Sequence, residues 1–140
     1  MDFTKLRRAI ESLETALRCS QMSHLADMDE SLPQVVRAAV IQHFEFTFEL
    51  SWKMLERLLS EKLGSSAVKQ MTNKALFRVA AERLLIEEPQ RWFTYLDARN
   101  KTSHTYNESV ADDVYGKIPA FIDDAKKLLT ALEQFVEWLR

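Results

Sequence analysis

Polar side chains able to bind phosphate and move protons crowd into residues 97–107 of the chain. Two of them, Arg99 and His104, stand five positions apart. A histidine titrates near neutral pH, so it can accept a 2′-hydroxyl proton or protonate a leaving oxygen. An arginine can hold a phosphate through two N–H groups and stabilise the charge that builds on it. The pair predicts RNA cleavage without a metal ion, giving a 2′,3′-cyclic phosphate and a 5′-hydroxyl.

The spacing of this pair sets a condition on the local structure. On an unbroken helix Arg99 and His104 would lie roughly 140° apart and could not meet at one phosphate. The helix must therefore end or distort between them, and residues 101–103 include two poor helix formers that allow this. Alternatively, a second copy of the chain in a dimer supplies the missing group. A non-catalytic interpretation also accounts for these residues: they would form a helix end that is capped by a histidine.

Other chemistries find less support in the sequence. Glu45 and Glu49 form an i, i+4 pair, but a di-metal site in a helical bundle also needs Glu-x-x-His, and none of the three histidines has Glu three residues before it. We expect these glutamates to line the groove near the polar stretch or to pair with Lys53. The only glycines are Gly64 and Gly116, which excludes a glycine-rich phosphate loop. No metal or cofactor is predicted.

The composition favours a few long helices in one domain. The chain has 140 residues, of which 46% are apolar and 29% charged, and its glycines and prolines number two and three. A length of this order suits a single domain with its own core, here residues 1–140. So few turn-forming residues argue against a many-stranded sandwich or barrel. The net charge of −2 argues against coating of nucleic acid by bulk charge.

The low cysteine content and the lack of a recognisable targeting signal predict an ordinary cytoplasmic protein. The single cysteine, Cys19, excludes an internal disulfide and a cysteine-based zinc site, and we expect it to be a small core or interface residue. The N-terminal residues lack the apolar segment of a signal peptide. The longest apolar run, Ala38–Ile41, is far shorter than the ~20 residues that span a bilayer. No membrane association is predicted.

Apolar periodicity predicts an all-α, four- to five-helix up-and-down bundle. The segment between the first two helices, 20–32, is expected to be a loop. Gly64 should stop the second helix. Ser109 should begin the last helix through a capping box, and Gly116 and Pro119 should kink or break it. The predicted helices are Thr4 to about Cys19, Gln34 to Leu63, Thr72 to Leu85, Pro89 to Lys101, and Ser109 to the end.

The second helix is apolar on more than one side, which predicts contact with a partner chain. Phe46, Leu50 and Trp52 lie off its main apolar face. The aromatic side chains that we expect as core or dimer anchors are Trp52, Trp92, Trp138 and Tyr95. Residues 69–104 hold seven Lys and Arg against four Asp and Glu, a local net charge of +3. A phosphate could be attracted there, although a mixed surface is the simpler interpretation.

The segment from Arg99 to Tyr106 resembles the Arg-x4-His-x-Tyr motif of HEPN-domain proteins. It is most similar to their subgroup called nucleotidyltransferase substrate-binding proteins. That subgroup also has a long second helix like residues 42–53 and an Asp two residues before the motif Arg, matched here by Asp97. The resemblance covers essentially the whole chain.

This resemblance implies a five-helix, homodimeric toxin that acts as an RNase beside a minimal nucleotidyltransferase antitoxin. Arg99 and His104 would be catalytic, with Asn100 and Asp97 supporting them. Tyr106 would be the residue on which the antitoxin places AMP, since a bulky anion there would repel RNA. The name of the subgroup leaves an alternative open. The chain would then present a substrate or nucleotide to its partner and cleave nothing itself.

Overall fold

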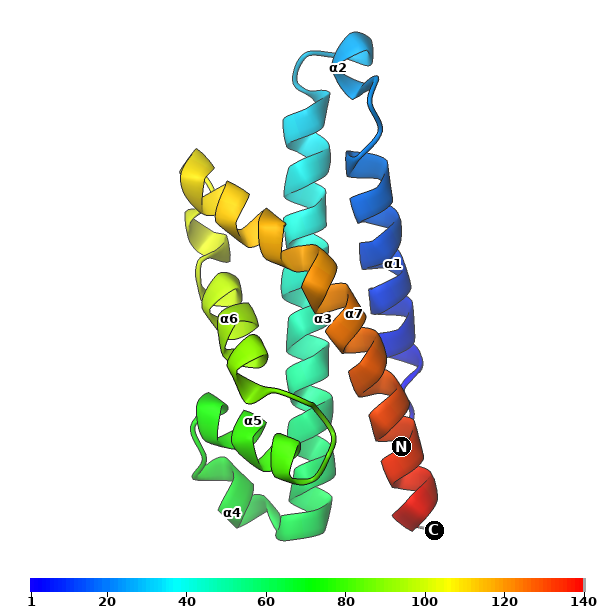
Figure 1. Cartoon of the computed structure of the whole chain (residues 1–140), viewed down its shortest axis with the longest axis vertical. Helices are drawn as coiled ribbons and strands as arrows, with labels where there is room; N and C mark the ends of the chain where they lie inside the picture. The colour runs from blue at the N-terminus through cyan, green and yellow to red at the C-terminus, as the bar shows by residue number, and fades with distance from the viewer. Residues whose placement is uncertain (140) are drawn as a thin grey trace.

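The computed structural model describes residues 1–139, with side chains described as far as Val136, and all their regular structure is helical. Two long antiparallel helices, α1 (Thr4–Ser20) and α3 (Leu32–Leu63), lie side by side (Figure 1). The third long helix, α7 (Glu108–Leu139), crosses α3, and α6 (Pro89–Asn100) lies on the other side of α3 from α1 (Figure 1). The all-α bundle predicted from the sequence is confirmed.

Shorter helices close the two ends of the bundle. The single-turn helix α2 (Leu25–Met28) lies at one end, within the segment expected to be a loop, and its Leu25 is buried. At the other end, α4 (Ser65–Lys69) follows α3 after Gly64, whose φ of 92° ends the long helix as predicted. The chain returns through α5 (Asn73–Glu82) to α6 (Figure 1). These short elements come in addition to the predicted helices.

An aromatic core joins α3, α5, α6 and α7. The ring of Phe121 on α7 meets Phe44 on α3 edge-on, with ring centroids 5.0 Å apart. Trp92 and Tyr95 of α6 pack against the same Phe121 ring at 5.8 and 5.3 Å. Both α6 side chains are buried, as predicted. This core fixes the position of α6, and therefore of the polar stretch at its end.

The capping box expected for the last helix is wrong, and of the expected kink or break only a bend is seen. Its cap is Asn107, whose side-chain oxygen accepts the backbone N–H of Ser109 at 3.0 Å and that of Val110 at 3.4 Å. The helix therefore begins at Glu108 and needs no capping box on Ser109. It also continues without a break through Pro119. Buried neighbours on the core face hold it together, and its axis bends within the orange part of Figure 1.

The end of α5 also differs from the prediction. The helix stops at Glu82 and not at Leu85. The N–H of Leu85 bonds to the carbonyl of Ala80 at 2.9 Å, and the N–H of Leu84 bonds to that of Ala81 at 3.0 Å. This is a Schellman motif with Leu84 at the position that usually holds glycine, at φ 62°.

Several side chains lie outside the core. Cys19 is exposed, so the expectation of a core residue is wrong. On α3, Val35 and Phe46 are 60% and 56% exposed, so part of its second apolar face is uncovered in the single chain. The side chain of Trp138 lies outside the described residues. Across residues 1–139, no helix combines the length and apolarity that crossing a membrane requires.

Candidate functional site

The polar stretch lies where α6 ends. The N–H of Lys101 bonds to the carbonyls of Asp97 and Ala98, at 3.2 and 3.1 Å, and closes the helix after Asn100. A single 3₁₀ turn, η1 (Thr102–His104), follows. The predicted end of the helix between Arg99 and His104 is therefore confirmed. The two side chains leave the backbone from different elements.

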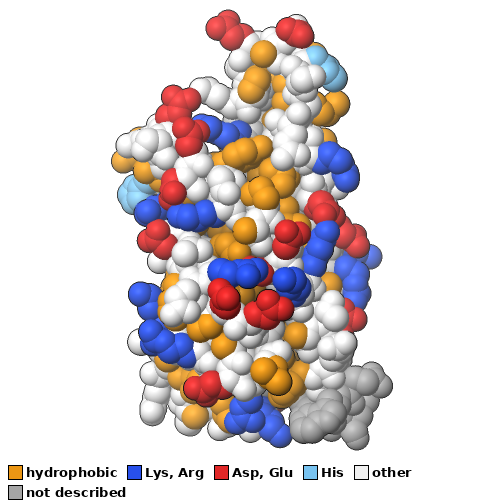
Figure 2. All heavy atoms as spheres, in the orientation of Figure 1, with side chains coloured by type: hydrophobic (Ala, Val, Ile, Leu, Met, Phe, Trp, Pro, Cys, Tyr) orange, Lys and Arg blue, Asp and Glu red, His pale blue; other side chains and the backbone are white. Residues whose placement is uncertain are grey.

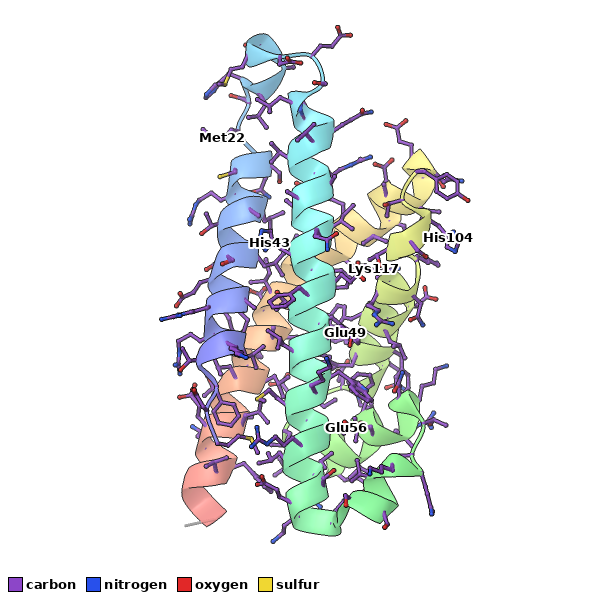
Figure 3. The ribbon with its side chains drawn as sticks, turned by 180° about the vertical axis from the view of Figure 1, so that it is seen from behind. Met22, His43, Glu49, Glu56, His104 and Lys117 are labelled. Carbon is purple, nitrogen blue, oxygen red and sulfur yellow. The ribbon has the colours of Figure 1, made fainter. Side chains whose placement is uncertain are left out.

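Arg99 is directed toward α3. Its Nη2 forms an ion pair with Glu49, which Figure 3 shows on the side of α3 that faces α6. Its Nη1 donates weakly to Asn100 Oδ1 at 3.4 Å. Its Nε is buried and has no hydrogen-bond partner within the described residues. The expectation that Glu49 lines the groove near the polar stretch is confirmed.

His104 lies on the opposite side of the same helix end. It is exposed, and Figure 3 shows it pointing away from α3 at the edge of the bundle. Its ring meets that of Tyr106 nearly edge-on, with centroids 6.1 Å apart, and Tyr106 is 86% exposed. No hydrogen bond joins Arg99 to His104 within residues 1–139. The single chain brings His104 and Tyr106 together, and Arg99 is bonded to Glu49 and Asn100.

Asp97 is placed to brace the helix end and does not contact Arg99. Its carboxylate pairs with Lys101 at 3.0 Å, and that lysine also reaches Asp113 of α7 at 3.7 Å. Lys117 pairs with Asp113 at 3.0 Å. The hydrogen bond from Lys117 lowers the pKa of Asp113, and the bond to Asp97 raises the pKa of Lys101. These exposed ion pairs connect the end of α6 to the start of α7.

A groove beside Arg99 contains a second unsatisfied donor. It measures about 190 Å³ and lies between α3, α5 and α6. The Nε1 of Trp52, like the Nε of Arg99, is buried without a hydrogen-bond partner within the described residues. We call this hollow the Trp52 groove; its walls are Phe48, Glu49, Trp52, Asn73, Leu96 and Arg99.

The sequence did not single out the Trp52 groove. Trp52 was expected to be a core or dimer anchor; it is half-buried, packs against the core and lines a hollow. The available signal is its position three residues after Glu49, which places both on one face of α3. Asn73 comes from α5, and no spacing in the sequence predicts that it meets them.

A larger hollow of about 300 Å³ lies beside Tyr106. Its walls include Arg37 and Ile41 of α3 and Ala111 of α7. Arg37 also forms an ion pair with Asp112. Tyr106 therefore lies at the mouth of a hollow with a cation in its wall.

Three of the seven basic side chains between residues 69 and 104 pair with carboxylates. Arg91 binds Asp124, Arg99 binds Glu49, and Lys101 binds Asp97. On the face shown in Figure 2, Lys and Arg side chains are interspersed with Asp and Glu, and no broad area carries one sign. Within residues 1–139 no group of three or more His, Cys, Asp or Glu is arranged to hold a metal ion.

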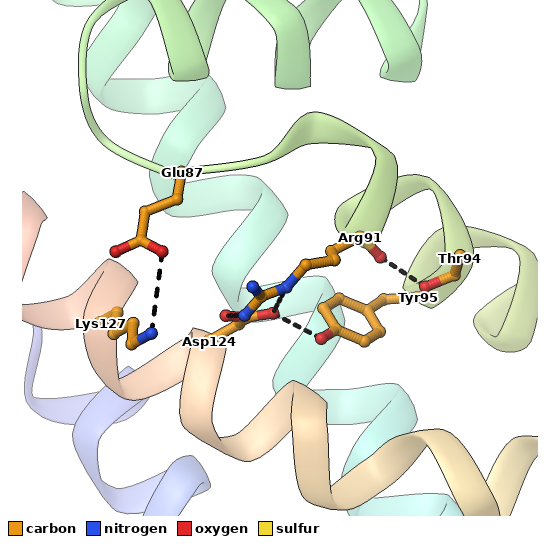
Figure 4. Close-up of polar contacts among 6 residues, drawn as sticks. All are labelled: Glu87, Arg91, Thr94, Tyr95, Asp124 and Lys127. Atoms are coloured by element: carbon orange, nitrogen blue, oxygen red, sulfur yellow. Dashed lines mark hydrogen bonds and ion pairs between the residues drawn. The ribbon is translucent and has the colours of Figure 1, made fainter.

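The buried Tyr95 and Asp124 form a separate cluster with the partly exposed Arg91 (Figure 4). The Nε of Arg91 donates to Asp124 Oδ2 at 3.0 Å, its Nη2 bonds to the other oxygen, and the Tyr95 hydroxyl donates to Oδ2. Burial, followed by the hydrogen bond to Asp124, raises the pKa of Tyr95. The same carboxylate raises the pKa of Arg91. This cluster joins α6 to α7 and leaves the Asp124 carboxylate fully engaged.

Nearly the whole chain is similar to known proteins. Residues 1–134 match the family described as nucleotidyltransferase substrate binding protein like. A Haemophilus influenzae protein named probable ribonuclease HepT is 34% identical over 136 residues, covering 96% of this chain and 93% of that protein.

Two solved structures are also similar. One, from Haemophilus influenzae, is described as the substrate binding domain of a nucleotidyltransferase. It has 32% identity and a TM-score of 0.86, covering 94% of this chain and 99% of that one. A crystal structure from Thermus thermophilus has 28% identity and a TM-score of 0.72, covering 91% of this chain and 98% of that one.

Proposed function

The chain belongs to the nucleotidyltransferase substrate binding protein like family, and from that premise we propose that it is a metal-independent endoribonuclease. It would act in the cytoplasm as the toxin of a pair whose antitoxin is a minimal nucleotidyltransferase. The observation that carries the proposal is the helix end between Arg99 and His104, in a chain 34% identical to a protein named probable ribonuclease HepT.

Arg99 is the proposed phosphate-binding group. A guanidinium has five N–H groups, and Glu49 and Asn100 engage two of them. The ion pair holds the side chain in one orientation while the remaining donors stay available for RNA. As the 2′-oxygen attacks phosphorus, negative charge builds on the other phosphate oxygens, and Arg99 would stabilise it.

His104 is the proposed proton-transfer group. A neutral imidazole accepts the 2′-hydroxyl proton as the 2′-oxygen bonds to phosphorus. The bond from phosphorus to the 5′-oxygen then breaks, and an imidazolium donates a proton to that oxygen. The imidazolium formed in the first half of the reaction can supply this proton, so one His104 serves each site.

We propose that the RNA site is assembled from two copies of the chain. Within one copy, Arg99 faces α3 while His104 faces outward. A second copy can therefore place its His104 beside the first copy's Arg99. The exposed Phe46 and Val35 on α3 provide uncovered apolar surface for self-association.

Tyr106 is the proposed acceptor of AMP. The partner would transfer an adenylyl group from ATP to the Tyr106 hydroxyl oxygen, forming a phosphodiester and releasing pyrophosphate and a proton. The hydroxyl-bearing side chain is 86% exposed and lies beside His104. An adenylate there would repel an RNA phosphate and obstruct His104.

A second candidate function is a non-catalytic subunit that binds a substrate or nucleotide for a nucleotidyltransferase. The description of the family and that of the Haemophilus influenzae structure favour it. This function would preserve complex formation and modification of Tyr106 without any cleavage of RNA by the chain alone.

An RNA cleavage assay separates the two functions. Purified protein with a chelator and end-labelled RNA should give fragments ending in 2′,3′-cyclic phosphate. His104→Ala should lower the rate by roughly 10²- to 10⁴-fold, the usual contribution of a general acid or base. His24→Ala, on an exposed histidine before α2, is the matched control. Cleavage by His104→Ala at the wild-type rate would contradict the catalytic role.

Mass spectrometry tests the modification. Incubation of the chain with its partner nucleotidyltransferase and ATP should add adenylate to the wild type and not to Tyr106→Phe. Tyr115→Phe, on a half-buried tyrosine bonded to Ser20, should still be modified. A wild-type chain that acquires no adenylate would contradict the acceptor role of Tyr106.

A further inference from the structure

The Trp52 groove holds both of the buried side-chain donors that lack a partner within the described residues. They are Trp52 Nε1 and Arg99 Nε. Buried N–H groups are nearly always hydrogen-bonded, and leaving one unpaired costs free energy. Trp52 and Arg99 both line one hollow, so a ligand that enters it is the candidate source of acceptor atoms for these groups.

The size and walls of the groove restrict what those acceptor atoms belong to. Its volume of about 190 Å³ lies below the ~300 Å³ at which pockets for drug-sized ligands begin. Phe48 and Leu96 give it apolar surface, and Asn73 adds an amide that can both donate and accept. A flat ring with polar atoms on its edge fits this combination better than a compact, fully charged ion.

Arg99 connects the groove to the proposed cleavage site. Its Nη2 is engaged by Glu49, and its side chain lines the groove. A nucleotide could therefore place its phosphate against the outer N–H groups of Arg99 while its base enters the hollow.

We propose that the Trp52 groove binds the nucleobase of the nucleotide next to the cleaved phosphate, and so sets the base preference of the enzyme. This inference rests on the proposed ribonuclease function. Trp52 Nε1 donates to an oxygen or ring nitrogen of the base, and the Asn73 amide reads a second atom on its edge. Trp52 and Asn73 are thus specificity-determining residues and take no part in proton transfer.

Nuclear magnetic resonance of the indole N–H groups tests the groove without requiring cleavage. The Trp52 signal is assigned by its loss in Trp52→Phe. Titration with the four 3′-nucleoside monophosphates should shift that signal, with one base binding at least several-fold more tightly than the others. Ribose 5-phosphate and inorganic phosphate, which lack a base, should leave it unmoved. An unmoved Trp52 signal with all four nucleotides, or an equal shift with ribose 5-phosphate, would overturn the proposal.

Asn73→Ala provides a second variant at an exposed position, so the test does not depend on Trp52→Phe folding. Loss of one hydrogen bond should weaken binding of the preferred base by roughly tenfold. Gln70→Ala, on an exposed residue between α4 and α5 and outside the groove, should bind like the wild type. Unchanged binding and base preference in Asn73→Ala would contradict its assignment.

Mapping of cleaved positions separates this inference from the proposed function. In an active enzyme, Asn73→Ala should alter the ratio of cleavage rates among the four bases by about tenfold. Cleavage by the wild type with an unmoved Trp52 signal would contradict nucleobase binding in the groove and would keep the ribonuclease function. A shifted Trp52 signal without any RNA cleavage would contradict the ribonuclease and retain the groove as a nucleobase site.

Discussion

Two arginines on α6, Arg91 and Arg99, have opposite surroundings. Arg91 binds both oxygens of the buried Asp124, which also accepts the Tyr95 hydroxyl. Arg99 binds Glu49 through one nitrogen and leaves its Nε buried and unpartnered within the described residues. Both are charged residues on one twelve-residue helix. Arg91 makes both of its bonds to one buried carboxylate that joins α6 to α7, whereas Arg99 divides its bonds between Glu49 and Asn100 beside the Trp52 groove.

The difference between the two arginines follows from what each end of α6 packs against. The first turns of α6 pack against α7, where the aromatic core surrounds Asp124 and removes it from water. A buried carboxylate is tolerated only when its oxygens are hydrogen-bonded. The last turn of α6 borders the Trp52 groove, where the carboxylate of Glu49 is about one-third exposed. Both arginine side chains are partly exposed, and the Arg99 pair is the one that borders this groove.

Removal of Arg99 should give the largest effect. Arg99→Ala should lower RNA cleavage by roughly 10²- to 10³-fold, since it removes a donor to the transition state. Its stability should change by no more than about 1 kcal/mol, because the ion pair is partly exposed. Cleavage rates and urea unfolding measure the two effects. The control is Arg57→Ala, on an exposed arginine of α3, and it should change neither.

Loss of the Asp124 carboxylate should act on stability instead. Asp124→Asn keeps the size of the side chain but weakens the bonds to Arg91 and Tyr95, and should cost about 2 kcal/mol. Urea unfolding measures this cost. Asp123→Asn, at the exposed neighbouring position, should cost almost nothing. Equal stability of the two variants would contradict the structural role of the cluster.

Alkaline pH should weaken the same cluster. The pKa of Tyr95 is raised above 10 in the folded chain by burial and by Asp124. Above pH 10 the unfolded chain therefore binds fewer protons at Tyr95 than the folded chain, so stability falls as pH rises. Tyr95→Phe should lower stability by about 1 kcal/mol at neutral pH and should reduce the loss above pH 10. Unfolding curves between pH 8 and pH 11 test this, and an unchanged alkaline slope would contradict it.

Leu84 sharpens the comparison, because its unfavourable backbone conformation ends a helix and involves neither arginine. It is 86% exposed and holds a φ of 62° at the end of α5. Leu84→Gly should stabilise the chain by about 0.5–1 kcal/mol and leave cleavage unchanged. Leu84→Ala keeps a Cβ at the same φ and should give no gain. A gain from alanine equal to that from glycine would show that backbone strain is not the cause.

Sequence periodicity predicted most of the fold. The long α3, its stop at Gly64 and the end of α6 before His104 follow from apolar spacing and from the residues at helix ends. The cap of α7 was misread, and its proline bends the helix without breaking it, for local reasons. The Asn107 side chain, two residues before Ser109, captures the free N–H groups, and core packing carries α7 through its proline.

Tertiary contacts account for the rest of what the sequence could not show. Asp124 lies 33 residues from Arg91, and Asn73 lies 26 residues from Arg99. Their meeting depends on how α5, α6 and α7 pack, and no spacing along the chain records it. Arg99, His104 and Glu49 were found because their types and positions fit a chemistry. Trp52 was interpreted as a core or dimer anchor because an indole is mostly apolar. That its N–H is buried without a partner in the described residues is visible only in the structure.

Assembly of the RNA site from two copies can be tested by mixing variants that are each inactive. Arg99→Ala and His104→Ala chains are co-expressed, and the cleavage rate of the mixture is measured. Random pairing makes half the dimers mixed, and each mixed dimer holds one intact site of two, so about a quarter of wild-type activity should return. If Arg99 and His104 act within one chain, every site in the mixture lacks a group. A mixture as inactive as its separate components would contradict the shared site.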